Sequence, residues 1–505
     1  MNRLLVVLAL AAAAPSAASA QSSLYEQLQT FSNLLNQIRL NYADSVPTER
    51  LVRGAIEGML ASLDPHSYYL AQADGQRMLD YRGRRLGGTG VVVEDVEDGV
   101  VVQTVLRRST GERGGVQPGD RVLAINDTAI TGLRAAAVQS RLVGERGRRV
   151  RLRLERGSRF EPETVSVRLR FEEPEERSVV LARTLGPGIG YVRLDEFGEE
   201  ATRELRSAAS NVMRGGARRL ILDLRGNPGG IVEQAVDVAS LFLPRNTLVF
   251  RTRGRRRETQ QEYRTTRDGE FAGVPLVILI DGRSASAAEA VAGALQDHDR
   301  ALVMGRRSFG KGLMQRAFLV PPQNDVVMLT VGWVELPSGR LIQRPYRGMT
   351  VGQYRELAGG EPESDTTVFR TAAGRAVTGG GGVTPDSLLP PPASLPAWFT
   401  AAADSGFILA VADSIAQSVA ADAAARDAWF QAEDQWRARL LEPFLARSRA
   451  RLGVTATPDS AVAARIARIL ADRVVEVRWG VQAQEDFRLR HDPAVRAATL
   501  AVQRL

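Results

Sequence analysis

Residues 276–295 read LVILIDGRSASAAEAVAGAL, and their pattern changes after residue 280. The first five residues are all apolar, which is typical of a fully buried strand. The small and apolar residues from Ala287 to Leu295 favour a helix, so residues 281–286 form the turn between strand and helix. Such a turn exposes a serine hydroxyl beside the free N–H groups of the helix N-terminus. Ser286 is therefore a candidate nucleophile, although capping the helix is the commonest use of Ser284 or Ser286 at this place.

A second strand-turn-helix unit lies upstream. Residues 222–230 read LDLRGNPGG, and a helical pattern starts at Ile231. Glycines leave main-chain amides unobstructed, and one such amide together with that of Ala287 would stabilise an oxyanion. A tight left-handed turn and a phosphate-binding loop are the two alternatives for this segment. The GxxxxGK[ST] pattern that a P-loop requires is absent.

Lysine occurs once in the chain, at position 311, although Lys and Arg together number 66. A site that needed only positive charge would accept arginine, which fills every other such position. Lysine differs because burial can make its amine neutral, and a neutral amine is a base. The alternative is that the single lysine is a chance survivor. Its setting, Phe309-Gly310-Lys311-Gly312, favours close approach of backbone and ligand.

The chain of 505 residues is too long for one hydrophobic core, and its patterns divide it into several regions. Helical spacing of apolar residues predicts an N-terminal helical region over 21–85. Short β-branched runs and turns predict a compact β domain over 86–171. Strands then alternate with helices over 172–394, which is a βαβ pattern. A proline-rich linker follows, and a helical C-terminal domain is predicted over 395–505. The predicted fold class is α/β in a multidomain chain.

Composition excludes several classes of site. The chain has no cysteine, which excludes a thiol nucleophile, a disulfide framework and a thiolate metal site. Its three histidines, His66, His298 and His491, lack the spacing of a zinc site. A serine nucleophile with a lysine base needs neither a metal nor an organic cofactor, and none is expected. The net charge of +8 comes from scattered residues without a nucleic-acid-binding signature, and no nucleic-acid partner is expected. His298 lies between Ser286 and Lys311, but a role at the end of the helix suffices for it.

The N-terminus has the pattern of a secretory signal. Arg3 is a short positive region, residues 4–14 are apolar, and Ala18-Ser19-Ala20 is a typical cleavage site. We therefore predict a signal peptide over 1–20, cleavage after Ala20, and export to the periplasm or otherwise out of the cytoplasm. The alternative is a retained membrane anchor, for which the apolar run is short.

Taken together, the motifs resemble those of the carboxy-terminal processing, or tail-specific, proteases, which are serine peptidases with a Ser-Lys dyad. The resemblance covers about residues 24–390. It rests on five motifs in a consistent order: LDPHSYYL at 63–70, GDRVLAIN at 119–126, DLRGNPGG at 223–230, SAS with Glu289 at 284–289, and FGKG at 309–312.

This resemblance implies a serine endopeptidase that forms an acyl-enzyme, with a core of the crotonase- and Clp-like class. The family nucleophile is the serine three residues before the glutamate, here Ser286 rather than Ser284. Lys311 is then the general base, and Gln315 positions its amine. The oxyanion amides map to Gly230 and Ala287. Ala288 stands where many relatives have serine, but that position is not the nucleophile.

The resemblance also implies that the β domain is an inserted PDZ domain, which binds a substrate's free C-terminus by adding it as a strand. The binding loop maps to four residues, Gly88, Thr89, Gly90 and Val91. Thr89 departs from the pattern because this position is normally apolar. The stretch Ser109-Thr110-Gly111 also lacks the proline that the family often carries.

The expected partners are proteins or peptides with free C-termini. Contact with a membrane surface, and a homodimer or adaptor contact through residues 395–505, remain hypotheses. The main alternative function is a catalytically inactive, PDZ-containing periplasmic scaffold. An acyl-CoA enzyme of the crotonase class is a third possibility, but it gives no role to a PDZ domain or to a single lysine.

Overall fold

The computed structural model describes residues 23–70, 86–96, 99–105, 109–117, 119–133, 135–158, 161–172, 177–322, 325–349, 353–354 and 367–505. The predicted signal peptide over 1–20 lies outside the described residues, as does the end of the predicted N-terminal helical region from residue 71 to 85. The chain divides after Leu63 into two compact units, and each is described by itself.

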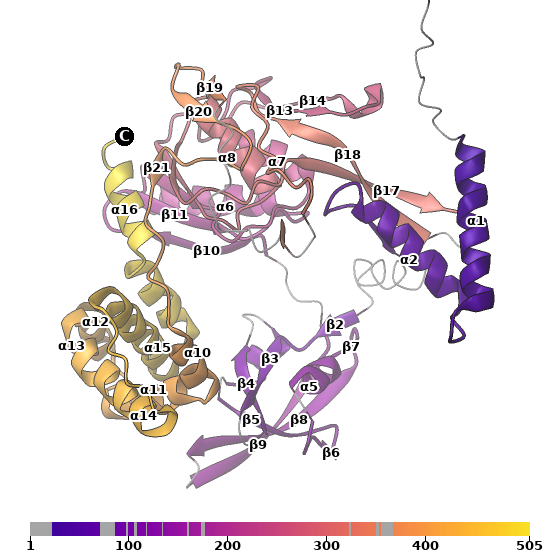
Figure 1. The fold of residues 1–505 in the computed structure, drawn as a ribbon. Helices are drawn as coiled ribbons and strands as arrows, with labels where there is room; N and C mark the ends of the chain where they lie inside the picture. Colours follow the sequence, from indigo (N-terminus) through magenta and orange to yellow (C-terminus); the bar gives the residue numbers. More distant parts are fainter. Residues whose placement is uncertain are drawn as a thin grey trace, which may run out of the picture. The chain divides into compact units, whose positions relative to one another are not determined.

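The N-terminal unit consists of two helices, α1 (Leu24–Asn41) and α2 (Thr48–Ala61) (Figure 1). α1 begins with a capping box, in which Ser23 and Glu26 each accept a hydrogen bond from the other's main-chain N–H. The helical spacing predicted for this segment is confirmed. No residue of α1 is buried within the described structure, so its apolar side chains remain largely exposed.

An antiparallel β domain lies near the start of the second unit in the sequence. Its larger sheet has the order β3-β4-β5-β8-β9 and consists of β3 (Val91–Val96), β4 (Gly99–Val105), β5 (Arg121–Ile125), β8 (Arg149–Ser158) and β9 (Glu161–Arg170), with β6 (Thr128–Ala129) paired to β5. β2 (Leu86–Gly88) pairs with β7 (Val143–Glu145), and the helices are α4 (Thr110–Arg113) and α5 (Ala135–Arg141). Alternate residues of β8, namely Val150, Leu152 and Leu154, are buried in the domain core. β3 is the end strand of the sheet, so one of its edges is unused by strand pairing.

The next part of the chain forms a mixed six-stranded sheet with the order β10-β11-β12-β15-β16-β21. Its strands are β10 (Val179–Thr184), β11 (Ile189–Leu194), β12 (Arg219–Asp223), β15 (Leu276–Ile280), β16 (Leu302–Gly305) and β21 (Ser387–Leu388). β10 runs antiparallel to β11 and the other pairings are parallel. The predicted strand over 276–280 is β15, and every one of its residues is buried, as expected when both faces are covered. Because β12 and β15 are parallel neighbours, the turns that follow them lie at the same edge of the sheet.

Helices cover both faces of this sheet. α6 (Ala201–Arg214), α7 (Val232–Ala239) and α8 (Ala287–Asp297) share one core with side chains such as Leu220 and Leu222 of β12. The intervening Ile221 points to the opposite face, where it packs with residues of α16 (Pro493–Val502). The last helix of the chain is thus part of the sheet's core.

A second sheet has the order β1-β18-β13-β14, with β17 paired to β18. Its strands are β1 (Tyr68–Leu70), β13 (Leu248–Arg253), β14 (Glu262–Arg264), β17 (Leu313–Val320) and β18 (Asp325–Glu335). β17 starts two residues after Lys311, and β19 (Val368–Arg370) forms a separate hairpin with β20 (Ala376–Thr378). The sequence patterns did not predict this sheet.

The predicted helical region over 395–505 is confirmed as helical. Its remaining helices are α10 (Ala397–Asp404), α11 (Phe407–Ser418), α12 (Ala423–Gln431), α13 (Glu433–Trp436), α14 (Glu442–Leu452) and α15 (Ser460–Arg490), and they enclose their own apolar core. Among the described helices, none alone has the length and apolar composition to cross a membrane; α10 and α11 meet that test only together, across a bend of 66°. The chain is therefore a multidomain α/β protein with helical regions at both ends.

Candidate active site

Ser286 lies where the sequence predicted it, between the end of β15 and the start of α8. It is the residue that precedes α8, and its backbone has φ 56° and ψ −115°. Residues other than glycine rarely adopt such backbone angles, and where they do, contacts with the surrounding structure hold them there. A serine on a strained strand-to-helix turn has the position of the nucleophile elbow of other hydrolases, and Ser286 also forms a capping box with Glu289 at the start of α8. The side chain is only partly buried, so a substrate can reach it.

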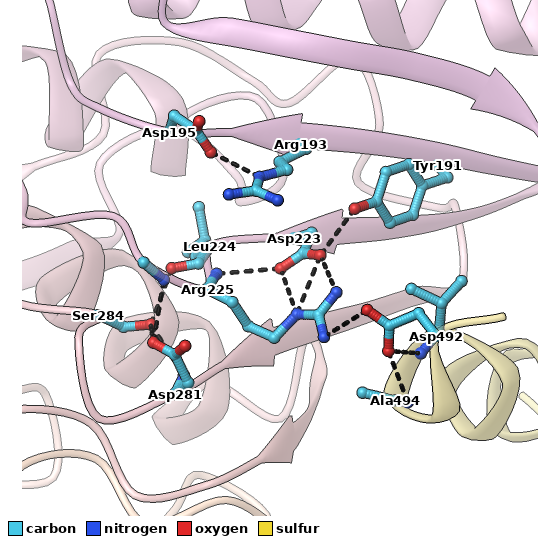
Figure 2. Close-up of polar contacts among 12 residues, drawn as sticks. Tyr191, Arg193, Asp195, Asp223, Leu224, Arg225, Asp281, Ser284, Asp492 and Ala494 are labelled. Carbon is cyan, nitrogen blue, oxygen red and sulfur yellow. Dashed lines mark hydrogen bonds and ion pairs between the residues drawn. The ribbon is translucent and has the colours of Figure 1, made fainter. Parts of the chain in front are cut away.

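Ser284 has a different role, which Figure 2 shows. The residue is completely buried, its Oγ accepts a hydrogen bond from the Asp281 N–H at 2.9 Å, and it donates to the Leu224 carbonyl at 2.7 Å. Leu224 belongs to the turn after β12, so this hydroxyl joins the two turns. The hydrogen bonds of Ser284 thus connect the two turns, which gives its hydroxyl a structural use.

Glu289 connects the two segments that carry the predicted dyad. Its side chain is fully buried, and its Oε2 accepts hydrogen bonds from the Ser286 N–H at 2.9 Å and the Lys311 N–H at 2.8 Å. Its Oε1 accepts from the Gly310 N–H at 2.7 Å and the Ser308 hydroxyl at 2.5 Å. Burial raises the pKa of Glu289, although these four donors act in the opposite direction. The main-chain nitrogens of Ser286 and Lys311 thus share one oxygen atom as acceptor.

The Lys311 amine lies in a surrounding that favours its neutral form. Burial lowers its pKa, and the nearby Glu289 carboxylate opposes that shift only in part. Within the described part of the chain, the ammonium group forms neither a hydrogen bond nor an ion pair. A partly buried amine that forms no ion pair with the described residues loses its proton more easily than a lysine on a protein surface.

Gln315 lies on β17, four residues after Lys311. Its Nε2 donates a hydrogen bond to the main-chain oxygen of His66 at 2.6 Å, and no hydrogen bond joins it to Lys311 among the residues that the structure describes. The Asp64 carboxylate holds the His66 turn, because its Oδ1 accepts from the N–H groups of His66 and Ser67, both at 2.8 Å. The sequence did not predict that the main-chain oxygen of His66 orients the Gln315 side chain. The one local indication was the turn that Asp64 and Pro65 predict just before His66.

The glycine-rich turn after β12 is fixed by Asn227. Its Nδ2 donates to the Leu194 carbonyl at 2.9 Å, and its Oδ1 accepts from the Gly229 N–H at 2.8 Å. Its main-chain oxygen accepts from the Ala285 N–H at 2.9 Å, one residue before Ser286. The turn is therefore tied directly to the segment that carries the serine.

Gly229 brings this turn into van der Waals contact with the start of α8. A Cβ atom at Gly229 would lie 2.7 Å from the Ser286 Cβ and 2.9 Å from the Ala287 nitrogen. The N–H groups of Gly230 and Ala287 donate to no protein group within the described residues. Two unused amides at adjoining turns, beside a serine, are the elements of an oxyanion hole.

His298 ends α8 on the side opposite to Ser286. The eleven residues of α8 lie between the two, which places them about 18 Å apart along the helix axis, and the His298 ring nitrogen lies 2.7 Å from the Leu248 carbonyl oxygen. It is not placed to exchange a proton with Ser286.

Three family models match consecutive parts of the chain. The activating protease CtpB N-terminal domain matches residues 9–74, the PDZ domain residues 77–155, and peptidase family S41 residues 188–350. The carboxy-terminal-processing protease of Bartonella bacilliformis is 32% identical over 328 residues, which cover 64% of this chain and 74% of that protein. The chain belongs to peptidase family S41. It is a carboxy-terminal processing serine protease with a PDZ domain.

Further relatives of the protease come from both sequence and structure. The carboxyl-terminal-processing protease of Synechocystis is 35% identical over 292 residues, which cover 56% of this chain and 66% of that protein. Among solved structures, the photosystem II D1 C-terminal processing protease is 25% identical, covers 72% of this chain and 88% of its own, and has a TM-score of 0.39.

The loop predicted to bind a substrate carboxylate in this S41 protease uses two of its amides internally. The Gly88 N–H donates to the Glu172 carbonyl at 2.8 Å, and the Thr89 N–H donates to the Leu142 carbonyl at 3.1 Å. Thr89 is buried, and its hydroxyl oxygen lies 3.4 Å from the Val91 nitrogen. The Gly90 N–H has no acceptor among the described residues. Threonine in place of the usual apolar residue at position 89 therefore adds a hydrogen-bond acceptor inside the loop.

Gln139 is a residue of the PDZ domain that the sequence reasoning missed. It lies on α5, its Nε2 donates to the Val91 carbonyl, and its Oε1 accepts from the Val93 N–H, both at 3.1 Å. The Val91 oxygen and Val93 nitrogen belong to the edge of β3 that strand pairing leaves unused. The side-chain amide of Gln139 thus makes the pair of hydrogen bonds that an added strand would make.

Proposed function

We propose that Ser286 attacks the carbonyl carbon of a scissile peptide bond while the neutral amine of Lys311 takes the hydroxyl proton. The protonated Lys311 then gives this proton to the nitrogen of the leaving peptide, which leaves an ester between Ser286 and the remaining substrate. A water molecule, deprotonated by the same amine, hydrolyses the ester and restores the serine. No step of this sequence requires a metal or an organic cofactor.

The observation that carries the proposal is the shared acceptor on Glu289. Hydrogen bonds to one buried carboxylate fix the main chain of the proposed nucleophile, Ser286, and that of the proposed base, Lys311. The amine at the end of the Lys311 side chain has no competing partner in the described structure. Catalytic groups must be held in place before the substrate arrives. The hydrogen bonds to Glu289 do this for the main chains of Ser286 and Lys311 and leave the Lys311 amine available as a base.

Two further assignments complete the site. The Gly230 and Ala287 amides would stabilise the oxyanion of each tetrahedral intermediate, a contribution that commonly amounts to about 2.7–4 kcal/mol per donor. Gln315 would position the Lys311 amine through its Oε1, because its Nε2 is already engaged by His66. The two adjoining strand-turn-helix units also support assignment of the core to the crotonase- and Clp-like class.

A covalent probe tests the proposed nucleophile on the intact protein. A fluorophosphonate should modify the folded chain once, and tandem mass spectrometry of the digest should place the adduct on Ser286. Denatured protein, which lacks the activating geometry, should remain unmodified. An adduct on Ser284, or none on the folded protein, would contradict the proposed nucleophile.

The proposed substrates are proteins or peptides whose free C-terminus binds the PDZ domain by strand addition to β3. The support is the edge of β3 that pairs with no other strand among the described residues, and the unused Gly90 amide. In this arrangement a peptide replaces the two hydrogen bonds of Gln139. The cleavage site would then lie close to the bound end of the substrate.

Replacing Gln139 with alanine should therefore tighten binding of a C-terminal peptide about thirtyfold, because two internal hydrogen bonds of roughly 1 kcal/mol each no longer have to be broken. Fluorescence anisotropy with a fluorescein-labelled peptide that ends in a free alanine carboxylate, and with its C-terminal amide, measures this change. Ser140→Ala is the matched control, since among the described residues the neighbouring Ser140 hydroxyl bonds only to the Ala137 carbonyl of its own helix. Equal binding by the two variants, or no preference for the free carboxylate, would refute strand addition at this edge.

We also propose that the protease acts outside the cytoplasm. The support is the signal-like sequence of residues 1–20 with its A-x-A site. Processing after Ala20 would leave Gln21 as the new N-terminus, which N-terminal sequencing of secreted or periplasmic material can identify. Contact with a membrane surface and adaptor or homodimer contacts through residues 395–505 remain hypotheses about partners.

A further inference from the structure

An ion-pair chain connects the glycine-rich turn to the last helix of the protein (Figure 2). Asp223, the last residue of β12, is completely buried, and its two oxygens lie 2.9 and 3.0 Å from the Nε atom of Arg225. Its Oδ2 also accepts from the Arg225 Nη2 at 2.5 Å and from the Tyr191 hydroxyl at 2.7 Å. The remaining Nη1 of Arg225 lies 2.8 Å from the Oδ2 of Asp492. One guanidinium therefore joins the end of a central strand to a distant part of the chain.

Asp492 divides its two oxygens between this contact and a helix cap. Its Oδ1 accepts from the N–H groups of Ala494 and Val495 at 2.8 and 3.2 Å, the first turn of α16. The apolar side of α16, including Val495 and Val502, packs against the sheet. The cap and its helix are thus fixed on the sheet, and Asp492 presents its second oxygen to Arg225 from a rigid element.

Arg225 is the second residue of the turn that offers the Gly230 amide. The N–H of the following Gly226 donates to the Asp281 Oδ1 at 2.9 Å, and Asp281 starts the turn that ends at Ser286. Gly226, Gly229 and Gly230 have φ of 75°, 100° and 146°. Glycines have many accessible conformations, so the conformation of this turn depends on the contacts that anchor its two ends.

We propose that Asp492 is a positioning residue for catalysis, which acts through Arg225 to hold the turn over residues 225–230 in the conformation that presents the Gly230 amide. The docked helix α16 is then required for full activity, although none of its residues contacts the reacting groups. This inference rests on the proposed oxyanion role of Gly230. It assigns to the C-terminal helical region a function in the reaction itself.

The variant Asp492→Ser separates the two functions of the aspartate. Serine also caps helices well, but its side chain is too short to reach Arg225. The expected result is a fall of about tenfold in kcat with little change in KM for an unfolded fluorescent casein, the effect of losing one charge-assisted hydrogen bond that orders the site. The rate of fluorophosphonate modification of Ser286 should fall by a similar factor, because the same amides stabilise the charge that develops on the probe.

Two further variants control for stability and for charge. Asp459→Ser changes an exposed aspartate that caps α15 through the Val462 N–H at 2.9 Å, and it should keep wild-type activity. Asp492→Asn keeps a cap and a neutral acceptor for Arg225, and it should recover part of the lost kcat. Arg225 itself is not a suitable test, because its removal leaves the buried Asp223 carboxylate without its partner.

The outcomes distinguish this inference from the proposed function. Wild-type protein that is not modified at Ser286 would refute the proposed nucleophile itself. Wild-type protein that is modified at Ser286, with Asp492→Ser reacting as fast as Asp459→Ser, would refute only the positioning role. A loss of kcat that matches the unfolded fraction in a thermal melt would also refute it, because the aspartate would then serve stability alone.

Discussion

Replacing Lys311 with arginine should lower kcat/KM about 10²- to 10⁴-fold, the range that a general base contributes. The substitution keeps the positive charge and a long side chain but removes the ability to give up a proton, since a guanidinium stays charged in proteins. The main-chain contact of residue 311 with Glu289 does not depend on the side chain, so the fold should be retained. Casein hydrolysis and the rate of fluorophosphonate modification are the two measurements.

The pH profile supplies a second readout of the same variant. Lys311 must be neutral to accept the proton, so wild-type activity should rise with pH as the amine loses its proton. Because burial lowers the pKa of Lys311, this rise should be centred below the ordinary range of lysine side chains. The residual activity of Lys311→Arg should show no such rise.

The matched control exchanges the same two residue types at a nearby position. Arg316 is an exposed residue of β17, five positions after Lys311, and Arg316→Lys should behave as wild type. A Lys311→Arg variant that keeps activity close to that of Arg316→Lys would show that a charge at 311 suffices. The proposed dyad would then be wrong.

The strand-turn-helix units of the site could be predicted from the sequence because each is local. The apolar run over 276–280 and the small residues from Ala287 determine a strand and a helix without reference to the rest of the chain. The sequence also indicated which residue type was unusual, namely the single lysine. These signals located the two turns and a candidate base before any three-dimensional information.

The contacts that join these units could not be predicted, because each depends on residues far apart in the chain. Glu289 served only as a spacing marker in the sequence, whereas in the structure it accepts hydrogen bonds from the Lys311 segment, 22 positions away. The pattern of α16 predicted a helix but not the sheet face that it covers. Gln139 was missed for the same reason, since nothing local to it identifies the edge of β3 as its partner.

Replacing Gly229 with alanine should reduce kcat/KM by about 10²-fold or more. The new Cβ would lie 2.7 Å from the Ser286 Cβ, 2.8 Å from the Ala285 oxygen and 2.9 Å from the Ala287 nitrogen. None of these atoms belongs to a flexible side chain, so the backbone of the nucleophile turn must move to relieve the overlap. A displacement of about 1 Å at reacting groups can cost 10²-fold in rate, and here it would shift the nucleophile and an oxyanion amide together.

Gly216→Ala separates this local effect from the general cost of a side chain in left-handed backbone. Gly216 has φ 98°, close to the 100° of Gly229, but a Cβ there would meet no atom within 4 Å. Both variants should lose about 1–2 kcal/mol of stability from the backbone conformation, measured by thermal melts. Only Gly229→Ala should lose activity in the fraction that remains folded. Equal specific activities of the two variants would mean that the glycine-rich turn changes conformation without moving Ser286. The close contact between the two turns would then have no part in catalysis.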